Sequence, residues 1–259
     1  MTTRNRDARL LALDGVPLVQ AGDDLCDIIL DGMMQAGEQL RPGDIVVLAQ
    51  KIVSKAQDRC VKLSEVIPST RALELAQVVQ KDARVIELIL GESLEVLRVR
   101  RDVIIVVHRS GFVMANAGID FSNVEANAAD ERVLLLPLDP DGTCKRIRGE
   151  LLARTRAPVG VIINDSHGRA WRNGTVGVAI GASGLPALLD LRGKPDLFGR
   201  ALRITQVGFA DELAAAASLL MGQADEATPI VVIRGLQHEQ QRNGRAAELV
   251  RPKELDLFR

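Results

Sequence analysis

Short apolar runs recur along the chain and predict the strands of a mixed fold. These runs are Ile45–Ala49, Val103–Val107, Val133–Leu136, Val159–Ile163, Val176–Ile180, Leu202–Val207 and Ile230–Ile233. Several consist of consecutive Val and Ile residues, which is typical of strands buried on both faces.

Segments with apolar residues at helical spacing lie between these runs. The helices that they predict run from Asp23 or Asp24 to about Gln35, onward from Pro68-Ser69, from about Thr143 to Arg154, and from Asp211 to about Met221. This alternation predicts an α+β or mixed α/β chain with some parallel crossovers. No linker divides the chain, so we expect a single unit over 1–259, with the number of subdomains left open and 236–259 as an exposed tail.

Composition and charge exclude several classes of protein. The 259 residues include 33 Lys and Arg against 34 Asp and Glu, a net charge of −1, so no electrostatic footprint for nucleic acid or acidic membranes exists. No apolar run is long enough to cross a membrane, and the polar start MTTRNRDARL does not resemble a signal peptide. Three widely spaced cysteines favour a reducing cytoplasm over a disulfide framework or a zinc site.

Four polar segments are candidates for chemistry, and the first is Gln50–Lys55. Lys51 and Lys55 stand four residues apart and can hold phosphates as point charges. From this segment alone, a solvated basic loop or the start of a helix is the better explanation.

Two further segments carry hard oxygen ligands of the kind that Mg²⁺ and Mn²⁺ prefer. The stretch 116–123 holds Asp120, Ser122 and two Asn, although such residues serve equally often in turns. The stretch 164–172 follows an apolar run, which predicts Asp165 at the end of a strand with Ser166 beside it. Arg169 and Arg172 add cationic groups there. His167 can serve as an acid or base, but a lone His is more often a hydrogen-bonded structural or surface residue.

The fourth segment, 221–229, follows the Ala-rich helix, which Gly222 can end as a C-cap. Gln223, Asp225 and Glu226 there can meet a metal or a nucleotide. A GxxxxGK[ST] P-loop, a GxGxxG fingerprint and a GxSxG elbow are all absent from the sequence. Residue patterns alone therefore indicate an α/β protein with an Asp-based metal and phosphate site.

The same segments resemble the coenzyme F420-0:L-glutamate ligase family, over nearly the whole chain from Gly15 to Gly235. The stretches that carry the resemblance are GDDL, PGDIVVLAQKIVSKAQDR, GFVMANAGIDFSNV, LLPLDPDGTCKRIR, VIINDSHGRAWRNG, GKPDLFGRAL and ADELAAAASLLMG. The closing RPKELDLFR is also similar to the ends of bacterial relatives. Motifs of this length in this order are far more specific than any short pattern.

The resemblance implies a GTP-dependent ligase that adds L-glutamate to coenzyme F420-0 through γ-linked amide bonds, by way of an acyl phosphate. It implies two divalent ions, Mg²⁺ or Mn²⁺, a monovalent cation such as K⁺, and an intertwined homodimer with an unusual fold that lacks a P-loop. Asp120 and Asp165 resemble the ligands of one metal, and Ser166 and Gln223 those of the second. Catalytic roles fall on Asp120, Asp165, Lys55 and Arg169.

The GTP contacts that the resemblance implies are Val16, Pro17, Leu18, Val19, Gln50, Lys51, Lys55, Asn123, Met221, Gly222, Gln223, Ala224, Asp225, Glu226, Ala227 and Thr228. The family segment often has Thr where this chain has Ser166, and Phe where it has His167. Two other functions use the same residues: a metal-dependent GTP phosphohydrolase, and a nucleotide-binding module without turnover.

Overall fold

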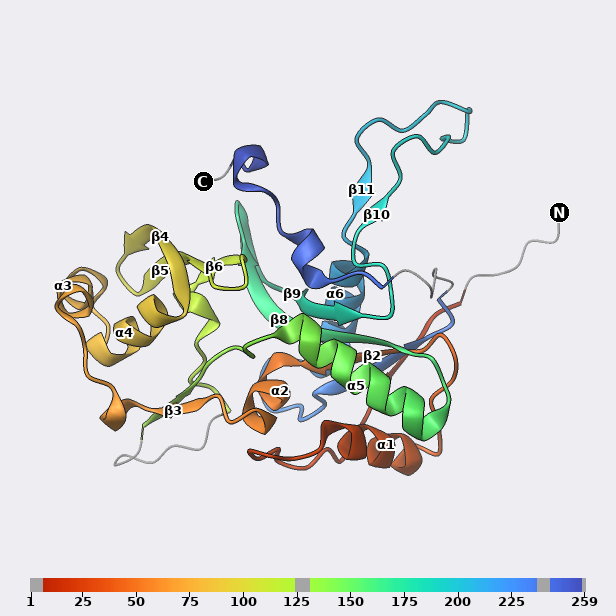
Figure 1. The fold of residues 1–259 in the computed structure, drawn as a ribbon, viewed down its shortest axis with the longest axis horizontal. Coiled ribbons are helices and arrows are strands. Elements are labelled where there is room, and N and C mark those ends of the chain that lie inside the picture. The colour runs from red at the N-terminus through yellow and green to blue at the C-terminus, as the bar shows by residue number, and fades with distance from the viewer. Residues whose placement is uncertain (1–6, 124–130, 237–242, 258–259) are drawn as a thin grey trace.

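A computed structural model describes residues 7–123, 131–236 and 243–257 (Figure 1). Its centre is a five-stranded sheet in the order β1-β12-β2-β8-β9. The strands are β1 (Arg9–Ala12), β12 (Ile230–Arg234), β2 (Ile45–Ala49), β8 (Gly160–Arg169) and β9 (Arg172–Ser183). Within this sheet β2 and β8 pair in parallel and the other neighbours are antiparallel. The chain is thus a mixed α+β protein.

Helices cover both faces of this sheet. On one face lie α1 (Leu25–Gln35), α2 (Gln50–Ala56) and α5 (Pro140–Thr155), and on the other lies α6 (Phe209–Met221). Strand β2 is buried on both sides: Val46 and Leu48 join the core under α1 and α5, whereas Ile45 and Val47 join the core under α6. The continuous apolar pattern of this strand is therefore due to burial on both faces, as predicted.

A smaller lobe, defined here as residues 60–123 and 131–135, packs beside the sheet (Figure 1). Its elements are β3 (Cys60–Lys62), η1 (Leu63–Glu65), α3 (Thr70–Val79), α4 (Ala83–Gly91), β4 (Ser93–Arg100), β5 (Val103–His108), β6 (Val113–Ala115), η2 (Asn116–Gly118) and β7 (Arg132–Leu134). Its separate apolar core includes Ile86, Ile89 and Ile104. Ser69 caps α3 and Asp24 caps α1, as predicted.

The predicted strand boundaries are wrong at three places. Strand β8 continues past Ile163 to Arg169, because the polar half of the strand pairs with β9 as a hairpin, so Asp165 lies within a strand and not at its end. Strand β9 is correspondingly longer than predicted. The predicted strand Leu202–Val207 shrinks to β11 (Gln206–Val207), which pairs with β10 (Leu189–Asp190) at the base of a protruding arm, residues 188–207 (Figure 1).

Part of the segment expected to be an exposed tail is anchored to the body. The side-chain oxygen of Asn243 accepts a 2.7 Å hydrogen bond from the Gly184 N–H, and Asp141 accepts one of 2.8 Å from the Ala246 N–H. Ala246 is consequently buried in η3 (Ala246–Leu249), whereas the last described element, η4 (Lys253–Leu255), is exposed.

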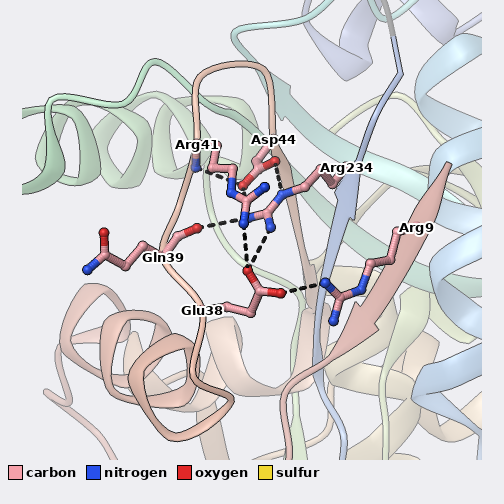
Figure 2. A network of polar contacts seen from close by, with 6 residues as sticks. All are labelled: Arg9, Glu38, Gln39, Arg41, Asp44 and Arg234. Atoms are coloured by element: carbon pink, nitrogen blue, oxygen red, sulfur yellow. Dashed lines mark hydrogen bonds and ion pairs between the residues drawn. The ribbon is translucent and has the colours of Figure 1, made fainter. Parts of the chain in front are cut away.

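An ion-pair network joins the ends of two strands, on the side of the sheet opposite the carboxyl end of β2 (Figure 2). Arg234, the last residue of β12, donates to both carboxylate oxygens of Asp44 at 2.8 and 2.7 Å, and to Glu38 at 2.8 Å. Asp44 is 1% exposed and stands immediately before β2. The network therefore fixes the ends of two neighbouring strands.

No helix in the described ranges is both long enough and apolar enough to cross a membrane.

Candidate active site

Asp120 and Lys51 come from distant segments and meet beside the carboxyl end of β2. Lys51 lies in the first turn of α2, which starts directly after β2, and its Nζ is 3.7 Å from Asp120 Oδ2. The same ammonium donates a 2.6 Å hydrogen bond to Ser122 Oγ. Asp120 is held by paired backbone hydrogen bonds with Leu134 of β7. The smaller lobe thus places a carboxylate beside the carboxyl end of β2 in the central sheet.

Asp165 lies close enough to Asp120 for the two carboxylates to repel each other. Burial raises the pKa of Asp120 above its ordinary value, Lys51 opposes that shift, and the negative charge of Asp165 adds to it. Two carboxylates that repel each other in a partly buried place are stabilised by a cation bound near both. The structure therefore brings together the two acidic side chains on which the predicted metal site depends.

Strand β8 directs its side chains to two sides of this place. Asn164 pairs with Ala49 at the end of β2. The residues that follow them in the sequence, Asp165 and Gln50, are therefore neighbours. Because successive side chains of a strand alternate between faces, Asp165 and Ser166 point to opposite sides. Ser166 faces the loop after α6, where its Oγ lies 2.9 Å from Gln223 Oε1.

The Ser166 and Gln223 oxygens also have a separation that suits one ion. Adjacent ligands of an octahedral Mg²⁺ lie about 3 Å apart, because each bond is about 2.1 Å long. Hydroxyl, amide and carboxylate oxygens are the hard ligands that Mg²⁺ prefers. The four predicted metal ligands therefore fit divalent cations by their chemistry and by their pairing.

The loop 221–228 borders this place and is held by its own polar groups. Asn123 Nδ2 donates to the Ala224 carbonyl at 3.4 Å, and Thr228 Oγ1 donates to the Leu220 carbonyl at 2.7 Å. The Ala224 N–H donates to Glu226 Oε2 at 2.8 Å, and this bond lowers the pKa of the Glu226 carboxyl. The loop thus offers backbone N–H groups that already hold one anionic group.

Gly222 ends α6 with a positive φ of 67°, as its predicted C-cap role requires. A side chain at this position would overlap the carboxylate of Glu226. Met221 turns inward, with its sulfur 3.3 Å from the Asn164 side-chain amide. It is therefore a core residue, while Asp225 and Ala227 are exposed.

The chain just after Val16–Val19 meets the carboxyl end of α2, where the Gly22 N–H donates to the Ala56 carbonyl at 3.0 Å. Val19 is buried in the core, whereas Leu18 is exposed. The segment therefore packs in the same apolar core as α2, the helix on which Lys51 and Lys55 share one face. The side-chain ammonium of Lys55 has no hydrogen-bond or ion-pair partner among the described residues.

Arg169 is the predicted catalytic residue that stands farthest along β8 from the carboxylates. It pairs with Arg172 at the turn of the β8–β9 hairpin, and its guanidinium donates to the Asn173 carbonyl at 3.2 Å. Four residues separate it from Asp165 along an extended strand, which corresponds to about 13 Å.

The structure adds three polar features that the sequence did not reveal. His167 Nε2 lies 3.0 Å from Asp165 Oδ2. Gln50 and Asn164 are both buried, and one side-chain oxygen of each has no hydrogen-bond partner in the described structure. The sequence signal for the His167–Asp165 contact was the polar stretch after Ile163. If the strand continues through that stretch, residues 165 and 167 lie on one face.

Fold and site together define a mixed α+β protein with paired carboxylates, a lysine-bearing helix and no P-loop. The chain belongs to the F420-0:Gamma-glutamyl ligase family, whose model matches residues 15–235.

Three relatives named coenzyme F420:L-glutamate ligase span almost the same length. The protein of Methanothermobacter thermautotrophicus is 48% identical over 251 residues, which is 96% of this chain and 98% of the relative. That of Methanopyrus kandleri is 45% identical over 255 residues, again 96% and 98%. That of Methanocaldococcus jannaschii is 40% identical over 261 residues and covers both chains fully.

Proposed function

We propose that this protein is a ligase that adds L-glutamate to coenzyme F420-0 through γ-linked amide bonds, with GTP as the source of energy. Full-length similarity to relatives that carry the ligase name supports the reaction. The structural observation that carries the proposal is the approach of Asp120 and Asp165 beside Lys51.

The reaction needs an activated acid, because a carboxylate is a poor acyl donor toward an amine. A carboxylate oxygen of F420-0 attacks the γ-phosphorus of GTP, the bond to the β-phosphate oxygen breaks, and GDP leaves. The glutamate amine then attacks the acyl carbon, phosphate departs with the electron pair of the C–O bond, and the amine loses a proton. Positioning and charge stabilisation dominate such a transfer.

Two divalent cations would be held by Asp120 with Asp165, and by Ser166 with Gln223. Mg²⁺ or Mn²⁺, when bound, supplies positive charge that allows an anionic acid to approach an anionic triphosphate. Lys51 and Lys55 add fixed positive charge on the same face of α2. The proposed nucleotide contacts are Gln50, Asn123, the segment 16–19 and the loop 221–228.

Arg169 enters the proposal as a second source of positive charge, carried by the β8–β9 hairpin. Its distance along β8 from Asp165 suits a substrate that extends from the cation site toward the hairpin turn. A monovalent cation such as K⁺ completes the proposed requirements. The free thiols of Cys26, Cys60 and Cys144 agree with the cytoplasmic location that we propose.

The protruding arm supports the proposed intertwined homodimer. Leu197, Phe198 and Ile204 are 99%, 86% and 87% exposed on it, a density of apolar surface unusual for a monomer. A second copy of the chain would cover these side chains. Light scattering coupled to size exclusion tests this: a dimer is expected, and Phe198→Asp should yield monomer.

The test of function combines F420-0, GTP, Mn²⁺ and L-glutamate, with mass spectrometry of the deazaflavin and a phosphate assay. Glutamate added to F420-0 together with GDP formation is the expected result. Phosphate release without glutamate addition would favour a GTP phosphohydrolase, and nucleotide binding without either product would favour a regulatory module. Replacing GTP with ATP checks the nucleotide preference, and GTP is expected to be required.

A further inference from the structure

His167 shares one face of β8 with Asp165 and contacts its carboxylate. The two residues are two positions apart in a paired strand, opposite Val176 and Val178 of β9, so their side chains leave the strand on the same side. His167 Nε2 lies 3.0 Å from Asp165 Oδ2, and the two side chains are only 12% and 13% exposed. The contact is therefore made largely out of bulk water.

The imidazole is itself held from behind by the smaller lobe. The Phe112 ring meets the His167 ring edge-on, with centroids 6.3 Å apart and an interplanar angle of 77°. Phe112 lies between β5 and β6 and packs against both apolar cores of the central sheet. Its packing limits the positions that the imidazole can take.

The direction of the hydrogen bond follows from its partners. A carboxylate that holds a cation is deprotonated and only accepts, so in that state the His167 Nε2–H donates to Oδ2. That bond occupies one carboxylate oxygen and leaves Oδ1 with its lone pairs directed elsewhere. A carboxylate fixed in this way loses less conformational freedom when it takes a ligand.

We propose that His167 is a positioning residue that fixes the Asp165 carboxylate so that its second oxygen faces the divalent cation. This inference rests on the proposed function, since it assigns Asp165 to the cation. His167 itself does not touch the cation. It acts through Asp165, and the smaller lobe acts through Phe112 and His167 in turn.

Binding of Mn²⁺ alone, followed by electron paramagnetic resonance without nucleotide or F420-0, tests the proposal. His167→Phe keeps an aromatic ring against Phe112 but removes the donor, and its Mn²⁺ dissociation constant should rise about 10- to 100-fold, the usual effect of losing an outer-shell partner. His167→Gln keeps a donor and should recover part of the affinity. Phe112→Leu keeps the hydrogen bond but removes the ring that limits the imidazole, so its loss of Mn²⁺ affinity should be smaller than that of His167→Phe.

Kinetics separate positioning from general loss of structure. The KM for Mn²⁺ should rise in His167→Phe while kcat at saturating Mn²⁺ changes little, and the thermal midpoint should stay near that of the unaltered protein. Should His167→Phe fail to fold, His167→Gln and His167→Ala with added imidazole provide the same comparison, and imidazole should restore Mn²⁺ affinity.

Two results would overturn the proposal, and they are distinguishable. If His167→Phe binds Mn²⁺ as the unaltered protein does while Asp165→Asn does not, His167 has no positioning role and the cation site stands. If Asp165→Asn also binds normally, the proposed cation site itself is wrong and the role of His167 is lost with it.

Discussion

Ser166 Oγ and Gln223 Oε1 lie 2.9 Å apart although 57 residues separate them in the chain. Strand β8 supplies the first and the loop after α6 the second, so the pair forms only when helix and sheet are docked. The pair carries no charge, which makes its role in cation binding separable from that of Asp120 and Asp165.

Ser166→Ala should therefore weaken the second cation without unfolding the protein. Loss of an outer-shell partner already costs about 10- to 100-fold in metal affinity, so loss of a direct ligand should raise the KM for Mn²⁺ by at least about tenfold. Ser166→Thr keeps the hydroxyl and should remain active. Steady-state ligation across a Mn²⁺ series measures both variants, and equal KM values for Ala and Thr would exclude a ligand role.

Asp120→Asn should abolish metal-dependent ligation and yet stabilise the metal-free protein at neutral pH. Burial, with a contribution from Asp165, raises the pKa of Asp120 above its ordinary value of 3.8, so the ionised form opposes folding. Because the pKa of Asp120 is raised in the folded protein, the stability that its protonated form contributes is fully present below pH 3.8. That contribution is lost as the pH rises through the folded pKa.

Thermal unfolding of the metal-free protein at several pH values measures this effect. The gain from Asp120→Asn should be largest at neutral pH and vanish in acid. Asp102→Asn, which changes an exposed carboxylate of the smaller lobe, is the matched control and should show no such pH dependence. A loss of stability at neutral pH in Asp120→Asn would show that Lys51 outweighs burial.

Glu92→Gln should destabilise the smaller lobe with the opposite pH dependence. Burial alone would raise the pKa of Glu92, but His108, whose Nε2 lies 3.5 Å from Glu92 Oε2, and the charges of Arg59 and Arg109 lower it below its ordinary value. Because the pKa of Glu92 is lowered in the folded protein, its ionised form contributes stability that is present above pH 4.5. That contribution is lost as the pH falls through the folded pKa.

Removing this charge leaves Arg59 without an ionic partner where its side chain is only 15% exposed, at a cost of about 3 kcal/mol. Urea unfolding at pH 7 and in acid measures it, and the difference between Glu92→Gln and the unaltered protein should shrink in acid. A difference that stays constant over the whole pH range would exclude the ionised carboxylate as its source.

Arg234→Ala should be among the most destabilising single changes in the central sheet. It leaves Asp44 buried without the guanidinium that pairs with both of its oxygens, which costs about 3–5 kcal/mol (Figure 2). Arg234→Lys should recover only part, because an ammonium cannot reproduce the forked contact.

Arg41 provides the control within the same network. Its side chain is 63% exposed and contacts Glu38 at 3.2 Å, so Arg41→Ala should cost less than about 1 kcal/mol. Urea unfolding compares the two variants. Equal losses would mean that burial of Asp44 does not decide the energetics of the network.

Periodic segments were predictable because their patterns are local. Helices α1, α3 and α6 and strands β2 and β12 lie close to their predicted bounds, since capping residues and apolar spacing depend on short stretches of chain. Helix α2 also agrees with one of the two explanations of its segment, although its first residue, Gln50, is buried and not solvated.

Elements that depend on distant partners were not predictable. The polar half of β8 resembles a loop, and only its pairing with β9 makes it a strand. The His167–Asp165 contact follows from that strand, so it was missed with it. The approach of Asp120 to Lys51 depends on how the smaller lobe docks, which no local pattern encodes; for these residues, the family resemblance supplied the expectation.

A crystal structure with Mn²⁺, with anomalous data collected at the manganese edge, tests the central claim most directly. We expect an anomalous peak bonded to carboxylate oxygens of both Asp120 and Asp165, and its loss in crystals of Asp165→Asn. A peak bonded to neither carboxylate, for instance beside Asp24 and Glu150, would contradict the proposed site.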